Sequence, residues 1–305
     1  MRKIQLLILI ITFSFTSCYN DRDDLEPETV TRNPNDNQFI SENGETYSTG
    51  LECNGTGNYN VDEENLLKNL TVPVNLPETF DLSDLLPPVE NQGQLASCTS
   101  WAVSYYMKSF QEKIESGEAY TETNTLSPSY TYNQLTTGTC GGTSINETLA
   151  LVQEKGVAPI AIFPYMEDDC STQASEAVNE VAADAKIADY KSLSGENMVA
   201  EMKTLITQNQ PVIIGAVLSL EFGKTDSFGL SAYREHQVDY NSVTCHAMLV
   251  VGFNNEFQAF KVVNSWGKSW GDNGFAWIDY KAFENVLNEN ADFRVINQAY
   301  VAYDL

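Results

Sequence analysis

The sequence predicts an α+β protein with two lobes and a cleft between them. Amphipathic helical patterns dominate residues 98–208, and apolar runs bounded by turn residues dominate residues 211–279. Helices and antiparallel strands are therefore segregated along the chain, which is typical of a helical lobe packed against a sheet. A cleft between two such lobes is a frequent place for a functional site.

Residues 1–18 are predicted to be a targeting segment. Two basic residues precede a short apolar run at residues 6–15, and this run is too short to span a bilayer comfortably. The run leads to Cys18 in a stretch that resembles a bacterial lipobox. That resemblance implies export and lipidation of Cys18, with an ordinary secretory signal as the alternative. We expect an outer-membrane lipoprotein that faces either the periplasm or the cell surface.

Residues 19–75 are predicted to form a flexible acidic tether, with one short helix at residues 63–70. Residues 19–65 hold twelve acidic and two basic residues, so this part of the chain repels itself. The segment is short and lacks apolar periodicity, and we therefore expect it to cause little or no autoinhibition. The compact domain is expected to cover residues 76–305.

A long helix is expected to open the helical part of this domain. It runs from Cys98 to Glu115, with Ser97 as a candidate N-cap and Gly117 just beyond its end. Four apolar residues that recur every four positions predict one buried stripe: Ala102, Tyr106, Phe110 and Ile114.

Three shorter helices are expected to follow. Ser144 and Glu147 form a capping-box pattern that opens a helix ending at Gly156. The other two helices are expected at residues 175–186 and 197–208.

Four strands are expected in the second part of the domain, because apolar runs there are bounded by turn residues. They are Pro211–Leu218, His246–Phe253, Phe257–Val263 and Phe275–Asp279, with a turn at residues 254–255.

The composition excludes several classes of partner and cofactor. The chain has 42 acidic and 17 basic residues and a net charge of −25, which argues against nucleic-acid binding. It has no clustered Cys and His spacing for zinc, no calcium loop and no phosphate-binding loop. We therefore expect no metal and no cofactor.

Three residues in chain order supply the parts of a thiol hydrolase. Cys98 lies at a predicted helix N-terminus, where the helix dipole favours a thiolate. His246 and Asn264 follow, and the chain has only two histidines. The other histidine, His236, lies in a polar loop and is expected to be solvated. The alternative for Cys98 is a small buried apolar side chain.

Five motifs support the hydrolase interpretation, and they occur in the order of a known family. They are Gln92 to Cys98, Cys140 to Gly142, Phe163 to Tyr165, His246 to Phe253 and Asn264 to Gly267. With them, residues 76–305 resemble the papain-like cysteine peptidases. The resemblance implies a papain-like two-lobe fold with the active site in the cleft.

The resemblance also implies a role for each matching residue. Cys98 would be the nucleophile, His246 its ion-pair partner and general acid, and Asn264 the group that orients the imidazole. Gln92 and the Cys98 backbone N–H would form the oxyanion hole. Two further roles follow: Trp266 would shield the His–Asn hydrogen bond, and Gly141 and Gly142 would let substrate backbone approach.

The cysteines depart from the family pattern in part. By analogy with the family, Cys140 and Cys170 are expected to form a disulfide. Leu95 replaces a family cysteine, and Thr99 replaces a tryptophan whose space Trp101 can fill in part. Two further expectations concern the remaining cysteines. Cys245 would face away from His246 and would not be a second nucleophile, and elimination suggests a Cys53–Cys245 bridge.

The leading interpretation is a cysteine peptidase that acts through a thioester acyl-enzyme. An endopeptidase is favoured over an exopeptidase. One alternative keeps this site but acts as an amidase or acyl transferase. Another is a catalytically silent surface binding protein. We expect a protein or peptide substrate, a monomer, no nucleic-acid partner and contact with a membrane only through the N-terminal lipid anchor.

Overall fold

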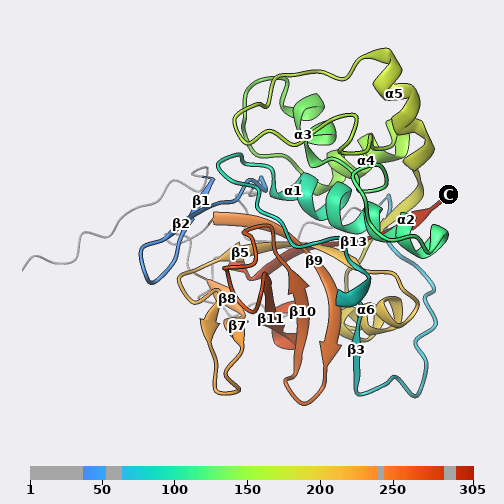
Figure 1. The fold of residues 1–305 in the computed structure, drawn as a ribbon. Coiled ribbons are helices and arrows are strands. Elements are labelled where there is room, and N and C mark those ends of the chain that lie inside the picture. The colour runs from blue at the N-terminus through green and yellow to red at the C-terminus, as the bar shows by residue number, and fades with distance from the viewer. Residues whose placement is uncertain (1–36, 53–63, 239–243, 285–292) are drawn as a thin grey trace, which may run out of the picture. The chain divides into compact units, whose positions relative to one another are not determined.

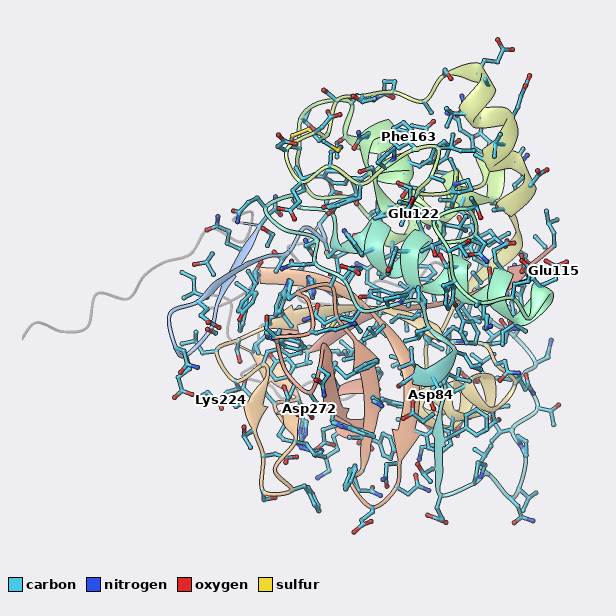
Figure 2. The ribbon with its side chains drawn as sticks, viewed as in Figure 1. Asp84, Glu115, Glu122, Phe163, Lys224 and Asp272 are labelled. Carbon is cyan, nitrogen blue, oxygen red and sulfur yellow. A yellow bond between two sulfur atoms is a disulfide. The ribbon has the colours of Figure 1, made fainter. Side chains whose placement is uncertain are left out.

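The structure is a computed structural model that describes residues 37–52, 64–238, 244–284 and 293–305. The predicted targeting segment with Cys18, about half of the tether and Cys53 lie outside these ranges. In the described part a helical lobe packs against a large, mainly antiparallel sheet (Figure 1), so the α+β prediction is confirmed. Side chains fill the space between the two lobes (Figure 2).

The described helices belong mostly to the helical lobe, and α6 packs on the sheet instead. In chain order they are η1 (Ser83–Leu85), α1 (Cys98–Ser100), η2 (Trp101–Lys108), α2 (Ser109–Ser116), α3 (Pro128–Thr136), α4 (Ile145–Lys155), α5 (Glu176–Ala182), η3 (Ala183–Ala185), α6 (Met198–Thr207) and η5 (Tyr280–Phe283).

The predicted long helix is confirmed as the continuous run α1–η2–α2, which ends at Gly117 in a left-handed conformation. Its middle part, η2, is a π-helix, and all eight of its residues are buried. The predicted stripe is wrong only at Ile114, which is 43% exposed. Ile114 lies in the last turn of α2, where residues 114–117 are all exposed, so this end of the helix extends beyond the core.

The shorter helices confirm the capping signals. Ser144 Oγ accepts a hydrogen bond from the Glu147 backbone N–H at 3.1 Å, and Ser175 caps α5 in the same way. The sequence interpretation was wrong in two places. It did not include the helix α3, although Ser127 and Pro128 are typical of a helix start. The helix predicted at residues 63–70 is absent from residues 64–70, where Leu66 forms a bridge with Ser192 instead.

One sheet of nine strands dominates the β lobe, in the order β4-β13-β5-β9-β10-β11-β7-β6, with β3 also paired to β9. Its strands are β3 (Thr79–Asp81), β4 (Ile187–Ser192), β5 (Val212–Leu218), β6 (Lys224–Thr225), β7 (Ser231–Tyr233), β9 (Thr244–Asn254), β10 (Ala259–Val263), β11 (Phe275–Asp279) and β13 (Ile296–Asp304). The four predicted strands are therefore confirmed. The smaller pairs are β1 (Gln38–Ile40) with β2 (Thr46–Ser48), and β8 (Gln237–Val238) with β12 (Phe293–Arg294).

The long helix lies against β9 and β5 at the centre of the molecule, which places its first residue beside the sheet. Lys108, near the end of η2, is 1% exposed. It pairs with Glu112 at 2.7 Å and with Asp304 at the end of β13. A buried lysine needs such partners because an unpaired buried charge is strongly destabilising.

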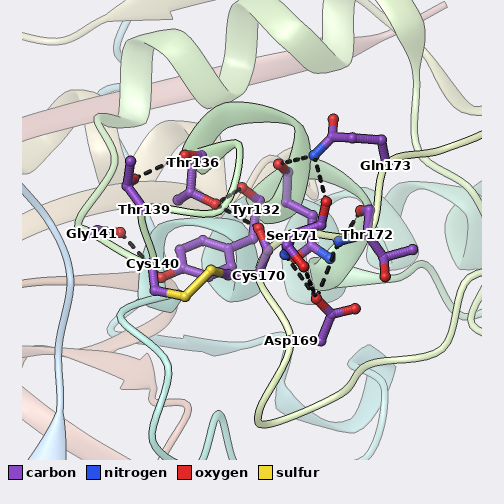
Figure 3. Close-up of a disulfide and its surroundings, with 11 residues drawn as sticks. Tyr132, Thr136, Thr139, Cys140, Gly141, Asp169, Cys170, Ser171, Thr172 and Gln173 are labelled. Carbon is purple, nitrogen blue, oxygen red and sulfur yellow. Dashed lines mark hydrogen bonds between the residues drawn. A yellow bond between two sulfur atoms is a disulfide. The ribbon is translucent and has the colours of Figure 1, made fainter.

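A disulfide between Cys140 and Cys170 fastens the loops of the helical lobe (Figure 3). The bridge closes a sequence separation of 30, and loop-closure entropy alone predicts a stabilisation of about 3–4 kcal/mol. Leu95 packs with Tyr132 and Cys170 in a small apolar cluster. An aliphatic side chain therefore fills the position at which the resemblance to the papain-like peptidases implies a cysteine.

Among the described residues, no helix is long and apolar enough to cross a membrane. The same part of the chain holds no group of three or more His, Cys, Asp or Glu side chains arranged to bind a metal ion.

Candidate active site

Cys98 is the first residue of α1, where backbone N–H groups point out of the helix. Its side chain is fully buried, and its Sγ accepts a hydrogen bond from the Ala247 backbone N–H at 3.3 Å. The sulfur therefore lies against the residue that follows His246 on β9. Ser97 does not cap the helix with its side chain, because its Oγ is bonded to the Tyr165 hydroxyl at 2.8 Å instead.

His246 and Asn264 form a hydrogen bond of 2.6 Å between Nε2 and Oδ1. Asn264 Oδ1 also accepts from the Ser265 backbone N–H at 2.7 Å, so this atom is the oxygen and Nε2 carries the proton. The neutral ring then has its lone pair on Nδ1, which has no hydrogen-bond partner among the described residues. The arrangement leaves Nδ1 as the nitrogen that can exchange a proton with a reacting group.

Trp266 covers the imidazole. Its ring stacks on His246 with centroids 4.6 Å apart and planes 28° apart. The indole also stacks on Tyr47 at 4.7 Å and on Phe39 at 5.3 Å. Trp266 is 1% exposed, and His246 and Asn264 are likewise 0% and 1% exposed.

Gln92 is fully buried, and its carboxamide orientation is fixed from both ends. Its Oε1 accepts from Ser265 Oγ at 2.6 Å, so its Nε2 points the other way. That Nε2 donates to the carbonyl oxygens of Leu95 and Thr49, both at 2.9 Å. A backbone carbonyl of the chain itself therefore already occupies a donor that could stabilise an oxyanion.

Residues 47–52, which we call the covering segment, pass through this site. The Leu51 N–H donates to the Cys245 carbonyl at 3.3 Å. On the other side, the Thr143 N–H donates to the Gly50 carbonyl at 2.8 Å, and the Glu52 N–H donates to the Thr143 carbonyl at 3.2 Å. The segment is thus held by main-chain hydrogen bonds from both lobes.

The covering segment differs from the flexible tether that the sequence predicts for residues 19–75. Residues 37–52 form the hairpin β1–β2 and then enter the site, and Phe39 and Leu51 are almost completely buried. Local composition suggested solvated chain, but the contacts that order this stretch come from residues far away in the sequence.

The two predicted substrate-contact glycines differ in their surroundings. A Cβ added at Gly142 would lie 2.7 Å from the Gly50 carbonyl oxygen, so glycine is needed for this close approach of two main chains. A Cβ at Gly141 would meet nothing closer than 3.9 Å. The Gly141 carbonyl instead accepts from the Tyr132 hydroxyl at 3.1 Å, beside the disulfide (Figure 3).

Comparison with known proteins gives the family. A model of the papain family of cysteine proteases matches residues 76–293. The chain belongs to the papain family. Residues 76–293 make up more than half of this chain, and they contain all the site residues described above except Phe39 and the covering segment.

Papain-family relatives of this chain are distant in sequence. Mouse (Mus musculus) cathepsin K is 28% identical over 209 residues, which are 67% of this chain and 60% of cathepsin K. The gamete and mating-type specific protein A of Dictyostelium discoideum is 28% identical over 233 residues, which are 74% of this chain and 46% of that protein. The chain therefore spans roughly half of the length of these relatives.

Solved structures of papain-family proteins share the fold. Xylellain, a cysteine protease from Xylella fastidiosa, is 20% identical, with a TM-score of 0.63 over 85% of this chain and 95% of xylellain. Procathepsin L2 from the larval midgut of Tenebrio molitor is 25% identical, with a TM-score of 0.59 over 84% of each chain. The papain-like two-lobe fold expected from the motifs is confirmed.

Three residues of this papain-family site had no role in the sequence interpretation. The Tyr165 hydroxyl bonds the Gln92 carbonyl at 2.6 Å, and Ser265 orients the Gln92 carboxamide. Thr99 Oγ1 donates to the Thr143 carbonyl at 3.2 Å. Tyr165 and Ser265 lie in motifs that the sequence displays, but only the folded chain brings them to Gln92.

The remaining cysteine and histidine sites are not part of the catalytic group. Cys245 is disulfide-bonded, so it is not a second nucleophile. The proposed partner, Cys53, lies outside the described residues. His236 is partly exposed, with its Nε2 3.4 Å from an Asp279 carboxylate oxygen.

Burial changes the acidity of both reacting groups. It raises the pKa of the Cys98 thiol to about 12, with hydrogen bonds from Ala247 and Thr99 acting in the opposite direction. Burial also lowers the pKa of His246 to about 4, and the hydrogen bond to Asn264 opposes this shift. Near neutral pH the covered site therefore favours a neutral thiol and a neutral imidazole.

We predict that His246 titrates near pH 4 while the covering segment is in place. The chain has only two histidines, so their Cε1 proton signals can be followed by NMR and assigned with His236→Gln. The folded pKa is below the ordinary value of 6.5. The unfolded chain therefore takes up this proton first as the pH falls. The corresponding stability is present above about pH 6.5 and is lost as the pH falls toward 4. A midpoint at or above 6.5 in the intact chain would contradict the prediction.

Proposed function

We propose that this protein is a cysteine endopeptidase whose covering segment keeps it latent. The main observation behind the proposal is the hydrogen bond from Gln92 Nε2 to the Thr49 carbonyl, in a segment whose Leu51 backbone N–H also contacts the Cys98 thiol. The Thr49 carbonyl oxygen thus accepts a hydrogen bond from a buried donor whose orientation is fixed. The same donor would stabilise the oxyanion that forms when a thiolate attacks a substrate carbonyl.

The proposed reaction uses the site residues in sequence. Cys98 loses its proton to His246 Nδ1, and the thiolate attacks the substrate carbonyl carbon. The oxyanion lies between Gln92 Nε2 and the Cys98 backbone N–H. His246 then returns the proton to the leaving amine, and a thioester remains on Cys98. Water, deprotonated by His246, hydrolyses the thioester and restores the thiol.

The path of the covering segment favours an endopeptidase. Six consecutive residues, 47–52, lie in the site, and the chain continues on both sides of them. A site that accepts the middle of its own chain does not require a free substrate terminus. We therefore infer that polypeptide substrates bind as continuous chains.

Latency follows from the same contacts, and it replaces the expectation of little or no autoinhibition. Cys98 is fully buried and Gln92 is already bonded, so substrate cannot reach either group until the covering segment leaves. Departure of the segment would also restore water to the site. Solvation would favour the thiolate and imidazolium, which burial now disfavours.

We further propose that the protein is exported and lipid-anchored through Cys18. The support is the short apolar run at residues 6–15 followed by the lipobox-like stretch. The high negative charge of the chain gives no other electrostatic reason for membrane contact. Metabolic labelling with a fatty-acid probe, compared with the variant Cys18→Ser, tests this assignment, and equal labelling of the two proteins would refute it.

The peptidase proposal is tested with a diverse peptide library, the purified protein and Cys98→Ala. Once the covering segment is displaced, products with new termini inside the peptides are expected from the protein that retains Cys98 and are expected to be missing with the variant. Bromelain has been solved in complex with the inhibitor E64. We expect E64 to label Cys98 once the covering segment is displaced. Cleavage that persists in Cys98→Ala would overturn the proposal.

The same reaction mixtures separate peptidase activity from the two alternatives. Products joined to an added amine, in place of hydrolysed ones, would identify an acyl transferase. A protein with a displaced covering segment, an accessible Cys98 and no turnover of any peptide would be a silent binding protein.

A further inference from the structure

A second cavity, of about 510 Å³, lies on the helical lobe next to the Gln92 loop. Its floor is aromatic. Trp101 and Tyr105 are each 3% exposed, and Tyr120 and Tyr165 are partly exposed. The ring of Trp101 packs against Tyr105 at 4.6 Å and against Tyr165 at 4.9 Å. The covering segment does not line this cavity, so the cavity is accessible in the latent form.

The tyrosine hydroxyls of this cavity are engaged elsewhere. Tyr105 donates to the Pro88 carbonyl at 2.8 Å, Tyr120 to the Leu85 carbonyl at 2.7 Å, and Tyr165 to the Gln92 carbonyl at 2.6 Å. The indole Nε1 of Trp101 is buried and has no acceptor among the described residues. The floor therefore offers a ligand the exposed parts of the Tyr120 and Tyr165 rings rather than free hydroxyl groups, while Trp101 and Tyr105 are almost completely buried.

Three carboxylates, from Glu90, Glu122 and Glu167, surround the aromatic floor. All three side chains are exposed, and none forms a salt bridge with a described residue. The lining includes no Lys, Arg or His. In Figure 2, Glu122 lies on the outer surface of the helical lobe, below Phe163. Aromatic faces and carboxylates both attract an organic cation, and both disfavour an anion.

The cavity is connected to the catalytic group at Gln92. Asn91, which precedes Gln92, belongs to the lining. The Glu167 carboxylate lies 2.6 Å from the position that a Cβ on Gly93 would take, so it borders the residue after Gln92. Tyr165 contributes its ring to the cavity and its hydroxyl to the Gln92 carbonyl. A polypeptide held at Gln92 can therefore reach the cavity with a neighbouring part of its chain.

We propose that this cavity is an accessory binding site for a lysine or arginine side chain of a polypeptide substrate. The proposal rests on the peptidase function proposed above, which it extends with a substrate feature. The cationic head lies between the carboxylates of Glu90, Glu122 and Glu167, and the aromatic floor packs against it and its alkyl stem. The contact is remote from the scissile bond, so it lowers KM more than it changes kcat.

Binding is tested in full-length Cys98→Ala, which requires no turnover. The probe is acetyl-Ala-Arg-Ala-amide, and its reference is the same peptide with uncharged citrulline in place of arginine. The acidic chain attracts any cation weakly, so two triple variants with the same change in net charge are compared. One is E90Q/E122Q/E167Q, and the other is E115Q/E154Q/E180Q, whose three glutamates are exposed and outside the cavity lining.

We expect the native cavity to favour the arginine peptide, and the cavity triple variant to reduce this preference about tenfold. The control triple variant is expected to change it by less than about twofold. The single variant Glu122→Gln gives a smaller loss and guards against misfolding of the triple variant. Equal losses in the two triple variants, or equal binding of the arginine and citrulline peptides, would overturn the proposal.

Measurements of turnover distinguish the accessory cation site from the peptidase activity. With the covering segment displaced, substrates that carry arginine at successive distances from the cleaved bond should show a lower KM than their citrulline counterparts at some of these distances. Cleavage without any arginine effect would refute the accessory site and leave the peptidase intact. Arginine binding without cleavage of any peptide would refute the peptidase and leave the cation site.

Discussion

Replacing Gly50 with alanine is expected to release the covering segment and to speed alkylation of Cys98 at least about 100-fold. Gly50 has φ = +128°, and a Cβ there would lie 2.0 Å from the Ala96 carbonyl oxygen. Neither the backbone conformation nor the contact tolerates a side chain. The segment must therefore move, and its hydrogen bonds to Gln92 and Thr143 must break.

The measurement is the rate of iodoacetamide labelling of Cys98 near neutral pH, with cleavage of a peptide library recorded in parallel. Gly44→Ala is the matched control, because Gly44 also has a positive φ but a Cβ there meets nothing within 4 Å. Both variants place alanine at a positive φ, and only Gly50→Ala has the clash. Equal labelling rates in the two variants, with native melting curves, would show that the covering segment does not control access.

Replacing Gln92 with alanine in the Gly50→Ala protein is expected to lower kcat by about 10²–10³-fold. The change removes the side-chain donor that would stabilise the oxyanion, and it leaves Cys98, His246 and Asn264 in place. In the native background the same change is expected to speed alkylation of Cys98, because Gln92 Nε2 also holds the Thr49 carbonyl.

These two opposite effects separate a catalytic role of Gln92 from a structural one. A merely structural residue would alter labelling and turnover in the same direction. Gln94→Ala is the control, because Gln94 lies two positions later and is exposed. A kcat that is unchanged in the Gln92→Ala, Gly50→Ala protein would remove Gln92 from the reaction scheme.

Local patterns in the sequence predicted the parts of the fold that local forces determine. Ser144 and Ser175 cap helices as expected, and continuous apolar runs became the central strands β5 and β9. The failures also have local causes. Ile114 lies in the exposed last turn of α2, and the polar composition of residues 128–136 obscured α3.

The candidate site was predictable where its motif residues carry reactive or hydrogen-bonding side chains. Cys98, His246, Asn264 and Gln92 carry side chains whose chemistry is evident from residue type and spacing. The covering segment was not predictable in this way. It is held mainly by main-chain hydrogen bonds to Cys245 and Thr143, and main-chain groups are the same in every residue. Only a long-range contact could reveal that polar residues near position 50 lie in the cleft.

The aromatic stack on Trp266 affects how much apolar surface the protein exposes. While Phe39 and Tyr47 lie on the indole, a set of neighbouring rings that includes Phe222 and Trp270 is shielded from water. Departure of these two rings would expose a large apolar face, since each aromatic side chain covers on the order of 150–250 Å². The form in which they stay in place therefore exposes less apolar surface. Displacement of the covering segment, as proposed above, would create an exposed apolar surface that favours self-association until a bound polypeptide covers it again.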